Sequence, residues 1–324
     1  MSIRPALTLL LLTTVVPELL TGSTPIYGFL NPGVLLFLIL GYGLAILLVR
    51  ELAVRLGVGL GGLVLFGLAY GIFNEGLLAK TFLLHRALPV HEYDDFGYWL
   101  GISFPWAAGI SSWHAFASVV FPISLTHYFF PKVSRNPWIG GRVALALGVV
   151  LLLLASLVFL GPSEKGVKGT PPQLAIMFSM MSILFVLGTT FKGSPLAHGG
   201  VPSLKPVLLG LSIILPFTLL SKIAAGKISP LIYFAVLAGA FYAYGWLLKR
   251  FGWLSLPGFL CFGIGWYLQN AVISILLRLG NPPLAAVSAL VDAVILFVLW
   301  RQIRRASQAK ALDSCNDDGS PTAV

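Results

Sequence analysis

About ten apolar stretches, separated by short polar segments, make up most of this chain, and most of them are long enough to cross a lipid bilayer. A helix rises about 1.5 Å per residue, so about 20 apolar residues cross a hydrocarbon core of about 30 Å. Backbone groups surrounded by lipid must bond within their own segment, which makes each span a helix. The predicted spans are residues 6–20, 33–49, 58–78, one within 99–130, 143–161, 173–191, 206–221, 228–248, 253–277 and 282–300. The predicted fold class is therefore all-α, a polytopic transmembrane helix bundle of about ten spans.

The positive charges of the chain agree with this bundle and orient it. Cytoplasmic loops of membrane proteins carry an excess of Lys and Arg. With both termini in the cytoplasm, the inner segments hold 14 of the 21 Lys and Arg residues. The net charge of +10 is therefore interpreted as membrane topology. Nucleic acid is not an expected partner, because the basic residues lie singly or in short groups between apolar runs. The lipid bilayer is the expected surrounding, and the cell membrane is the expected location of this multi-pass protein.

The composition bounds the number of domains. With 57% hydrophobic and 10% charged residues, the chain leaves no room for a soluble domain of useful size. Residues 1–305 are predicted to form a single transmembrane domain, followed by a disordered cytoplasmic tail at 306–324. The first span also resembles a secretory signal peptide, whose removal would leave nine spans. Pro17 and Glu18 interrupt its apolar core and favour retention.

Residues 31–80 and 229–277 share a pattern that suggests a parallel internal repeat. In each segment a basic residue, Arg50 or Arg250, precedes a string of matched spacing. The matched residues are Gly62, Phe66, Gly67, Tyr70 and Asn74 in the first segment and Gly258, Phe262, Gly263, Trp266 and Asn270 in the second. Glycine and phenylalanine are abundant in this chain, so chance similarity remains the alternative.

One carboxylate lies deep in an apolar run, because Glu75 follows Asn74 late in the span at 58–78. A charge in bare hydrocarbon costs about 2.5 kcal/mol or more, so this side chain is expected to face other helices, a partner or water. Counting from the inner basic residues at about 1.5 Å per residue places Asn74, His114 and Asn270 about 27 to 30 Å above the inner boundary. Glu75 falls in the same layer, near the outer face.

This polar layer supports two interpretations. In the first, Glu75, His114, Asn74 and Asn270 are catalytic residues of a watered pocket that is open to the outer leaflet. Glu75 beside His114 would then act as a general base on water, and the asparagine amides would hold an oxyanion or the water itself. In the second, the asparagines are interhelical hydrogen-bonding groups, and Glu75 pairs structurally with His114 or Lys80.

Four further side chains are predicted to contact a substrate or an ion. Ser111 and Ser118 share one helical face with His114, at the i, i+3, i+7 spacing. Asp292 has the pattern of a proton or cation relay position, about 14 Å above the inner boundary. Glu18, in the first span, would lie near the same pocket as Glu75. A structural hydrogen bond for Asp292 and an interfacial position for Glu18 remain the alternatives.

No cofactor and no metal ion are predicted. Cys261 and Cys315 give no spacing for a disulfide framework or a zinc site. A phosphate-binding loop is excluded, because the chain holds no Gly-x-x-x-x-Gly-Lys-Ser/Thr string. His114 and His127 lie on one predicted helix and supply no facing pair for haem. The outer loop at 85–97 carries His and acidic residues without strict ligand spacing, so a solvated loop is favoured over a divalent-ion site.

The string Tyr70-Gly71-Ile72-Phe73-Asn74-Glu75-Gly76-Leu77 is followed about forty residues later by Trp113-His114-Ala115-Phe116 and Phe121-Pro122-Ile123. This pattern resembles a family of uncharacterised prokaryotic multi-span membrane proteins that commonly show Glu-Glu-Gly at this point. It is also distantly similar to the CAAX-protease and bacteriocin-processing group of intramembrane enzymes, which carry Glu-Glu-x-x-x-Arg on one helix and Phe-x-x-x-His on the next. Here Asn74 stands for the first Glu, Ala79 for the Arg and Ile110 for the Phe. The resemblance implies counterparts for Glu75 and His114 alone.

Three functions are compatible with these features. The first is a membrane-embedded hydrolase-like enzyme with an outward-facing Glu75/His114 site, acting on a lipid or a membrane peptide. The second is a secondary transporter that uses Glu75 and Asp292 as proton or cation sites. The third is a non-catalytic membrane subunit that binds a partner protein or a lipid.

Overall fold

The computed structural model describes residues 3–20, 24, 26–85, 91–161, 166–193, 196–197, 202–277, 280 and 282–317. The α-helices are α1 (Ile3–Leu19), α2 (Pro32–Leu38), α3 (Ala45–Arg55), α4 (Leu60–Gly71), α5 (Phe104–His114), α6 (Phe121–Phe129), α7 (Gly141–Leu160), α8 (Pro171–Thr190), α9 (Leu204–Leu211), α10 (Ile214–Ala225), α11 (Pro230–Arg250), α12 (Leu256–Leu277) and α13 (Pro282–Asp317). Three π-helical segments, Ile39–Leu44, Ile72–Leu78 and Ala115–Val120, continue α2, α4 and α5. Short 3-10 turns lie at Ile26–Leu30, Thr81–Leu83, His91–Tyr93 and Pro131–Val133. β1 (Tyr98–Trp99) and β2 (Ile102–Ser103) form a small antiparallel hairpin before α5.

The helices of this chain have the lengths and composition of membrane spans. Within the described residues, nine helical segments are long and apolar enough to cross a bilayer. They are Pro32–Arg55, Leu60–Leu78, Phe104–Phe129, Gly141–Leu160, Pro171–Thr190, Leu204–Ala225, Pro230–Arg250, Leu256–Leu276 and Pro283–Arg305. The remaining predicted span, residues 6–20, corresponds to α1, which has 17 residues and contains Pro17. The prediction of an all-α polytopic bundle is confirmed.

The chain packs into two compact units. The first unit comprises Met1–Pro17, Tyr27–Pro195 and Ile214–Tyr244, and the second comprises Glu18–Ile26, Leu196–Ile213 and Gly245–Val324. Helix α13 continues to Asp317, whereas the sequence analysis placed a disordered tail at 306–324. Residues 318–324 of that predicted tail lie outside the described residues.

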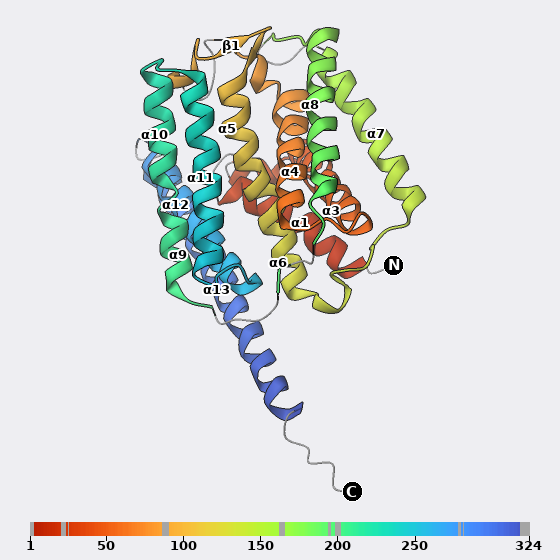
Figure 1. The fold of residues 1–324 in the computed structure, drawn as a ribbon, viewed down its shortest axis with the longest axis vertical. Coiled ribbons are helices and arrows are strands. Elements are labelled where there is room, and N and C mark those ends of the chain that lie inside the picture. Colours follow the sequence, from red (N-terminus) through yellow and green to blue (C-terminus); the bar gives the residue numbers. More distant parts are fainter. Residues whose placement is uncertain are drawn as a thin grey trace, which may run out of the picture. The chain divides into compact units, whose positions relative to one another are not determined.

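Helix α4 lies at the centre of the first unit, between α5 and α8 (Figure 1). Glycines permit this close packing: a Cβ atom at Gly71 would lie 2.5 Å from the Cα of Ser111, and one at Gly62 would lie 2.3 Å from the carbonyl oxygen of Gly188. Gly67 meets Ala115 in the same way as Gly71 meets Ser111. Small residues at such positions let the helix backbones approach each other in a membrane. The packing of α4 on α5 places Glu75 and His114 on neighbouring helices.

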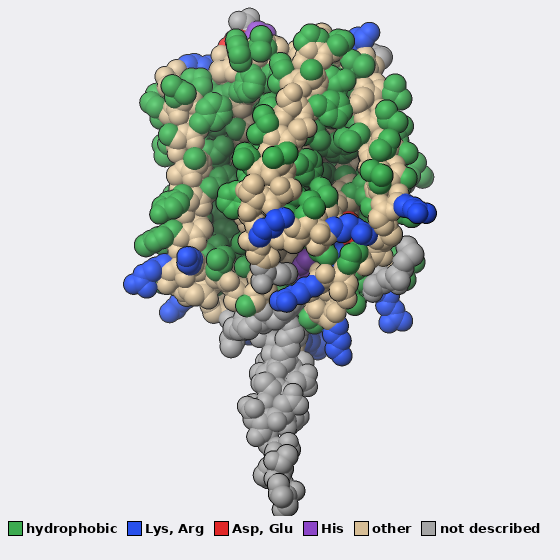
Figure 2. Space-filling model, turned by 45° about the vertical axis from the view of Figure 1, so that its right-hand side comes forward, with side chains coloured by type: hydrophobic (Ala, Val, Ile, Leu, Met, Phe, Trp, Pro, Cys, Tyr) green, Lys and Arg blue, Asp and Glu red, His purple; other side chains and the backbone are tan. Residues whose placement is uncertain are grey.

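The flanks of α7 and α8 are apolar and face outward. Leu145 and Leu157 of α7 are 71% and 69% exposed, and Val186 of α8 is 65% exposed. Figure 2 shows the same pattern on one face of the molecule, where hydrophobic side chains cover the helix flanks and Lys and Arg lie near the helix ends. Exposed apolar flanks of this extent are typical of lipid-facing helices, because a soluble protein would bury them.

The second unit is built on the packing of α9 against α12. A Cβ atom at Gly210 would lie 2.0 Å from the carbonyl oxygen of Phe262, and one at Gly265 would lie 1.9 Å from that of Val207. Helix α12 is α-helical throughout, whereas the matched segment of the first copy of the predicted repeat ends in the π segment Ile72–Leu78. The two copies therefore differ in backbone form, and the repeat stays a prediction.

Candidate functional site

The three π segments of the first unit meet around the imidazole of His114. The segment Ile72–Leu78 holds Asn74 and Glu75, and Ala115–Val120 begins directly after His114. The segment Ile39–Leu44 holds Tyr42, whose ring centroid lies 5.9 Å from that of His114. A π segment interrupts the regular register of an α-helix and is frequent at functional sites. The backbone irregularities of this unit are thus concentrated at one place.

Glu75 and His114 are paired. Glu75 Oε1 lies 3.1 Å from His114 Nε2, and the two side chains are 15% and 1% exposed. This distance is within hydrogen-bond reach, and both groups are removed from most of the solvent. The structure therefore brings together the acid and the imidazole that the sequence analysis placed at one depth.

Side chains on both sides of this pair extend it into a network. The indole Nε1 of Trp106 donates to Thr81 Oγ1 at 3.0 Å, and Thr81 Oγ1 donates to Glu75 Oε2 at 2.6 Å. An indole N–H can only donate, so the hydroxyl of Thr81 is free to direct its own proton to the carboxylate. On the other side, His114 Nδ1 lies 2.9 Å from Ser118 Oγ. We call Trp106, Thr81, Glu75, His114 and Ser118 the Glu75–His114 network.

Asn74 and two tyrosine rings complete the surroundings of His114. The amide Nδ2 of Asn74 lies 3.4 Å from His114 Nε2, the same nitrogen that contacts Glu75. The ring of Tyr70 packs edge-on against the imidazole, at a centroid distance of 5.8 Å. The hydroxyl of Tyr70 also donates to the carbonyl oxygen of Gly41 at 3.1 Å, which ties the first π segment to α4. The imidazole is thereby held in one orientation.

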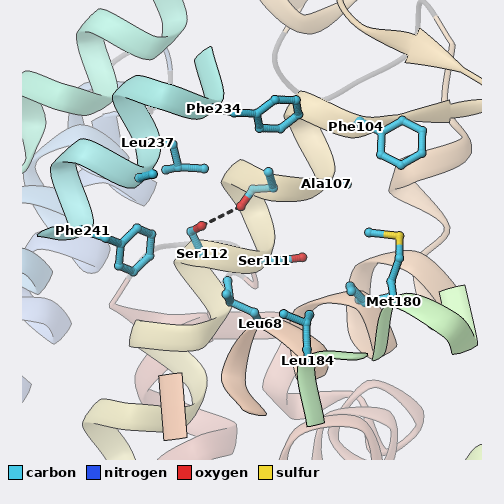
Figure 3. Close-up of a pocket in the computed structure, with 13 residues that line it drawn as sticks. Leu68, Phe104, Ala107, Ser111, Ser112, Met180, Leu184, Phe234, Leu237 and Phe241 are labelled. Carbon is cyan, nitrogen blue, oxygen red and sulfur yellow. Dashed lines mark hydrogen bonds between the residues drawn. The ribbon is translucent and has the colours of Figure 1, made fainter. Parts of the chain in front are cut away.

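Ser111 lies one turn before His114 and faces a cavity of about 310 Å³. Within the part of the chain that the structure describes, its hydroxyl is buried and has no hydrogen-bond partner. The cavity, which we call the Ser111 cavity, is otherwise apolar apart from Ser112 (Figure 3). Its walls are formed by Leu68, Ile72, Phe104, Ala107, Ala108, Ser111, Ser112, Met180, Leu184, Phe234, Leu237, Ala238 and Phe241.

Lys80, the other predicted structural partner of Glu75, bonds elsewhere. Its amine donates to the carbonyl oxygen of Gly161 at 2.7 Å, at the end of α7. Burial lowers the pKa of the Lys80 amine. Lys80 also adopts a left-handed backbone conformation with a φ of 58°, which turns the chain after the π segment. This turn brings Thr81 back to the carboxylate of Glu75.

The remaining predicted site residues, Glu18, Asn270 and Asp292, belong to the second unit. Glu18 Oε2 accepts from the hydroxyl of Thr24 at 2.6 Å. Asn270 Nδ2 donates to the carbonyl oxygen of Trp266 at 2.8 Å, one turn earlier in α12. Asp292 is 3% exposed in α13. The convergence of Glu18 and Asn270 with Glu75 and His114 stays a prediction, and so does the relay role of Asp292.

A second buried ionic cluster lies around Arg50 and Glu51. It was not predicted, because in the sequence these two residues look like ordinary charges at a helix end. Arg50 is 0% exposed and donates to Glu51 Oε1 at 2.6 Å and to the carbonyl oxygen of Ser134 at 2.6 Å. Its guanidinium carbon lies 3.5 Å from the ring centroid of Trp138. Glu51 Oε1 accepts from the backbone N–H of Trp138 at 2.8 Å. We call Arg50, Glu51 and Trp138, with the loop carbonyls that they bind, the Arg50 cluster.

The chemistry available at the Glu75–His114 network is acid–base chemistry. Within the described residues, no three His, Cys, Asp or Glu side chains gather in a way that could hold a metal ion. The network supplies a carboxylate, an imidazole and two hydroxyls in one chain of hydrogen bonds. Such a chain can accept a proton at one end and deliver one at the other.

Comparison with known proteins places the chain among membrane proteins. No curated protein matches it, and no solved structure matches it. An uncharacterized membrane protein family matches residues 7–243, a segment that contains every member of the Glu75–His114 network and ends within α11. The chain therefore belongs to this uncharacterized membrane protein family and is a multi-pass membrane protein.

Proposed function

We propose that this protein is a hydrolase of the cell membrane, in which Glu75 and His114 activate water against an ester or amide bond of a lipid or membrane peptide. The observation that supports it most directly is the 3.1 Å distance between Glu75 Oε1 and His114 Nε2. A general base must lie within hydrogen-bond reach of the group with which it exchanges a proton. The resemblance to the CAAX-protease group points to the same two residues, although Ala79 stands at the position of its Arg.

The proposed step uses water as the only co-reactant. The water oxygen attacks the carbonyl carbon of the substrate while the Glu75–His114 pair takes one proton from that water. The bond from the carbonyl carbon to the leaving oxygen or nitrogen then breaks, and the same proton passes to the leaving atom. The products are a carboxylic acid and an alcohol or amine. Asn74, beside His114 Nε2, is positioned to donate to the oxyanion of the intermediate.

The fixed carboxylate favours this role over a purely structural one. Trp106 holds Thr81, and Thr81 donates to Glu75 Oε2, which leaves Oε1 directed toward the imidazole. A pair of groups that is oriented by further donors is the arrangement that acid–base catalysis requires. The 15% exposure of the Glu75 side chain leaves it accessible to a water molecule.

The test is hydrolysis by the full-length protein in phospholipid vesicles, with release of a labelled acyl chain or of a peptide fragment as the readout. We expect Glu75→Gln and His114→Gln to lower the rate by about 10²- to 10⁴-fold, with folded yield retained. Glu92→Gln is the matched control, because Glu92 is an exposed loop carboxylate. An unchanged rate in Glu75→Gln would refute the proposal. Loss of folded protein in both variants would favour the structural interpretation.

A proton- or cation-coupled transporter is the second candidate, because Asp292 is 3% exposed within the apolar helix α13. Ionisable groups inside spans commonly mark ion pathways. Proton flux into vesicles separates the two candidates. If the protein shows proton flux that Asp292→Asn stops, and shows no hydrolysis, the transporter is supported and the hydrolase is contradicted.

A further inference from the structure

We propose that the Ser111 cavity binds the acyl chain of an ester-linked lipid, with the Ser111 hydroxyl donating to the ester carbonyl. The inference rests on the proposed function and deepens it, because it selects a lipid over a membrane peptide as the substrate. It is carried by the shape and lining of the cavity, by the buried hydroxyl of Ser111 and by the position of that hydroxyl relative to His114.

The cavity has the size and lining of a site for one hydrocarbon chain. Its walls come from α4, α5, α8 and α11 of the first unit, and all lining side chains except Ser111 and Ser112 are apolar. Its volume of about 310 Å³ is at the lower end of the range of about 300–1,000 Å³ for small-molecule pockets. Phe241, on its rim, is 42% exposed, so the cavity reaches the surface of this unit beside α11. A single chain can enter there.

The two serines of the cavity differ in their bonding. Ser112 donates to the carbonyl oxygen of Ala108 at 2.7 Å and is satisfied within its own helix. Ser111 is 4% exposed, and its hydroxyl has no partner among the residues that the structure describes. In Figure 3 the Ser111 hydroxyl extends toward the side of the cavity where Met180 lies. A buried hydroxyl without a partner is unfavourable, so a carbonyl oxygen bound at this point would stabilise the complex.

Ser111 and Ile72 lie near members of the Glu75–His114 network along their own helices. Ser111 precedes His114 by three residues of α5, which is about 4.5 Å along the helix axis. Ile72, which lines the cavity at the start of the π segment after α4, precedes Glu75 by the same number of residues. An ester carbonyl at Ser111 would thus lie on the side of the cavity next to the acid–base pair, with the hydrocarbon chain in the apolar remainder.

The apolar lining explains why the inferred substrate is a lipid. A peptide in this cavity would bring backbone N–H and C=O groups against side chains that cannot bond them, which is unfavourable. An acyl chain brings one polar group, the carbonyl, and the cavity offers it one unpaired hydroxyl among the described residues. The ligand and the cavity therefore each contribute one polar group that needs a partner.

Photolabelling tests the chain site independently of hydrolysis. The probe is phosphatidylcholine with a diazirine on one acyl chain, incorporated into vesicles with the full-length protein, and the labelled peptides are mapped by mass spectrometry. We expect labels on α5 and α11, and we expect Ala108→Leu, which places a larger side chain in the cavity, to lower this labelling by about tenfold. Gly148→Leu is the matched control, because Gly148 lines a separate apolar cavity of about 240 Å³. Labelling that resists Ala108→Leu, or that Gly148→Leu lowers equally, would overturn the inference.

Two further variants separate this inference from the proposed function. Glu75→Gln should keep the acyl labelling while hydrolysis is lost, and undiminished hydrolysis by this variant would refute the role proposed for Glu75 but leave the lipid site. Ser111→Ala should raise KM for an ester lipid by about fivefold, the size of one net hydrogen bond, with little change in kcat. Ser112→Ala is its control and should leave KM unchanged. Equal effects of the two serine variants would contradict the role of the Ser111 hydroxyl.

Discussion

The first unit contains two buried ionic groups, and they differ in what bonds them. In the Arg50 cluster, Arg50 donates to the carbonyl oxygen of Ser134 at 2.6 Å, and Glu51 accepts from the backbone N–H of Trp138 at 2.8 Å. In the Glu75–His114 network, the outer contacts are with side-chain hydroxyls, at 2.6 Å for Thr81 and 2.9 Å for Ser118. The first pair is bound mainly to the main chain, although Arg50 Nε also donates to His127 Nε2 at 3.3 Å, and the second pair is bound to hydroxyls that can rotate.

We infer that this difference separates an ion pair that holds structure from one that can exchange protons, as the proposed function requires. A backbone carbonyl only accepts and a backbone N–H only donates, so the main-chain partners of the Arg50 cluster cannot exchange roles, and they tie the cluster to the loop after α6. A hydroxyl both donates and accepts and can turn to suit a new proton position. The Glu75–His114 network can therefore gain or lose a proton without losing its hydrogen bonds. Burial alone does not distinguish the two groups, whereas the chemistry of their partners does.

The largest effect in this comparison is expected for Arg50→Met. Removing Arg50 leaves the buried Glu51 with Arg55, at 3.5 Å, as an ionic partner, and it leaves the loop carbonyls without the Arg50 donors. We expect the free energy of unfolding to fall by about 3 to 5 kcal/mol. Titration with SDS in mixed micelles, followed by circular dichroism, measures this change. A loss below about 1 kcal/mol would mean that the cluster does not hold the loop.

The same isosteric change in both groups sharpens the comparison. Glu51 accepts from a backbone N–H, which cannot accept in return, so the amide of Glu51→Gln would turn an N–H₂ group toward another donor. In Glu75→Gln, by contrast, the hydroxyl of Thr81 can rotate and accept from the new amide. We expect Glu51→Gln to lower the free energy of unfolding by about 2 kcal/mol more than Glu75→Gln. The same SDS titration compares the two variants. Equal losses would show that the partners of the two carboxylates do not differ in the way inferred here.

The bundle was predictable from the sequence because its determinants are local. Apolar length decides whether a segment spans, and Lys and Arg decide which ends lie together. The pairing of Glu75 with His114 was also accessible, because a carboxylate and an imidazole within apolar runs are costly unless they meet a partner. The spacing of His114 and Ser118 predicts that they share one helix face, and the two side chains lie 2.9 Å apart.

The rest of the network depends on backbone features that leave no residue signature here. The π segments shift the register of three helices around His114, and no pattern of residues in the sequence indicated them. Thr81 lies beyond the predicted end of its span, and it reaches Glu75 only because Lys80 adopts a left-handed conformation and turns the chain. Arg50 and Glu51 read as ordinary charges at a helix end, since the sequence does not show that a loop folds over them.

Thr81→Val tests how firmly the Glu75–His114 pair is oriented. Valine keeps the shape of threonine, but it removes the donor to Glu75 and the acceptor for the indole of Trp106. We expect the free energy of unfolding to fall by about 1 kcal/mol and the hydrolysis rate to fall by about tenfold. Thr81→Ser, which keeps the hydroxyl, is the control and should restore most of the rate. A rate that is unchanged in Thr81→Val would remove this residue from the orienting role.

The smallest effect is expected in the outer loop, where ion pairs are exposed. His91 Nδ1 lies 3.2 Å from Asp94 Oδ2, and the two side chains are 83% and 20% exposed. Solvent screens such a pair, so His91→Ala should change the free energy of unfolding by less than about 0.5 kcal/mol and leave hydrolysis unchanged. The SDS titration and the vesicle assay measure both quantities. Neighbouring Lys227 donates to the backbone carbonyl of Asp94. A larger loss for His91→Ala would mean that exposed charges of this loop also stabilise the backbone. The distinction drawn from the bonding partners of the two buried groups would then not extend to the surface.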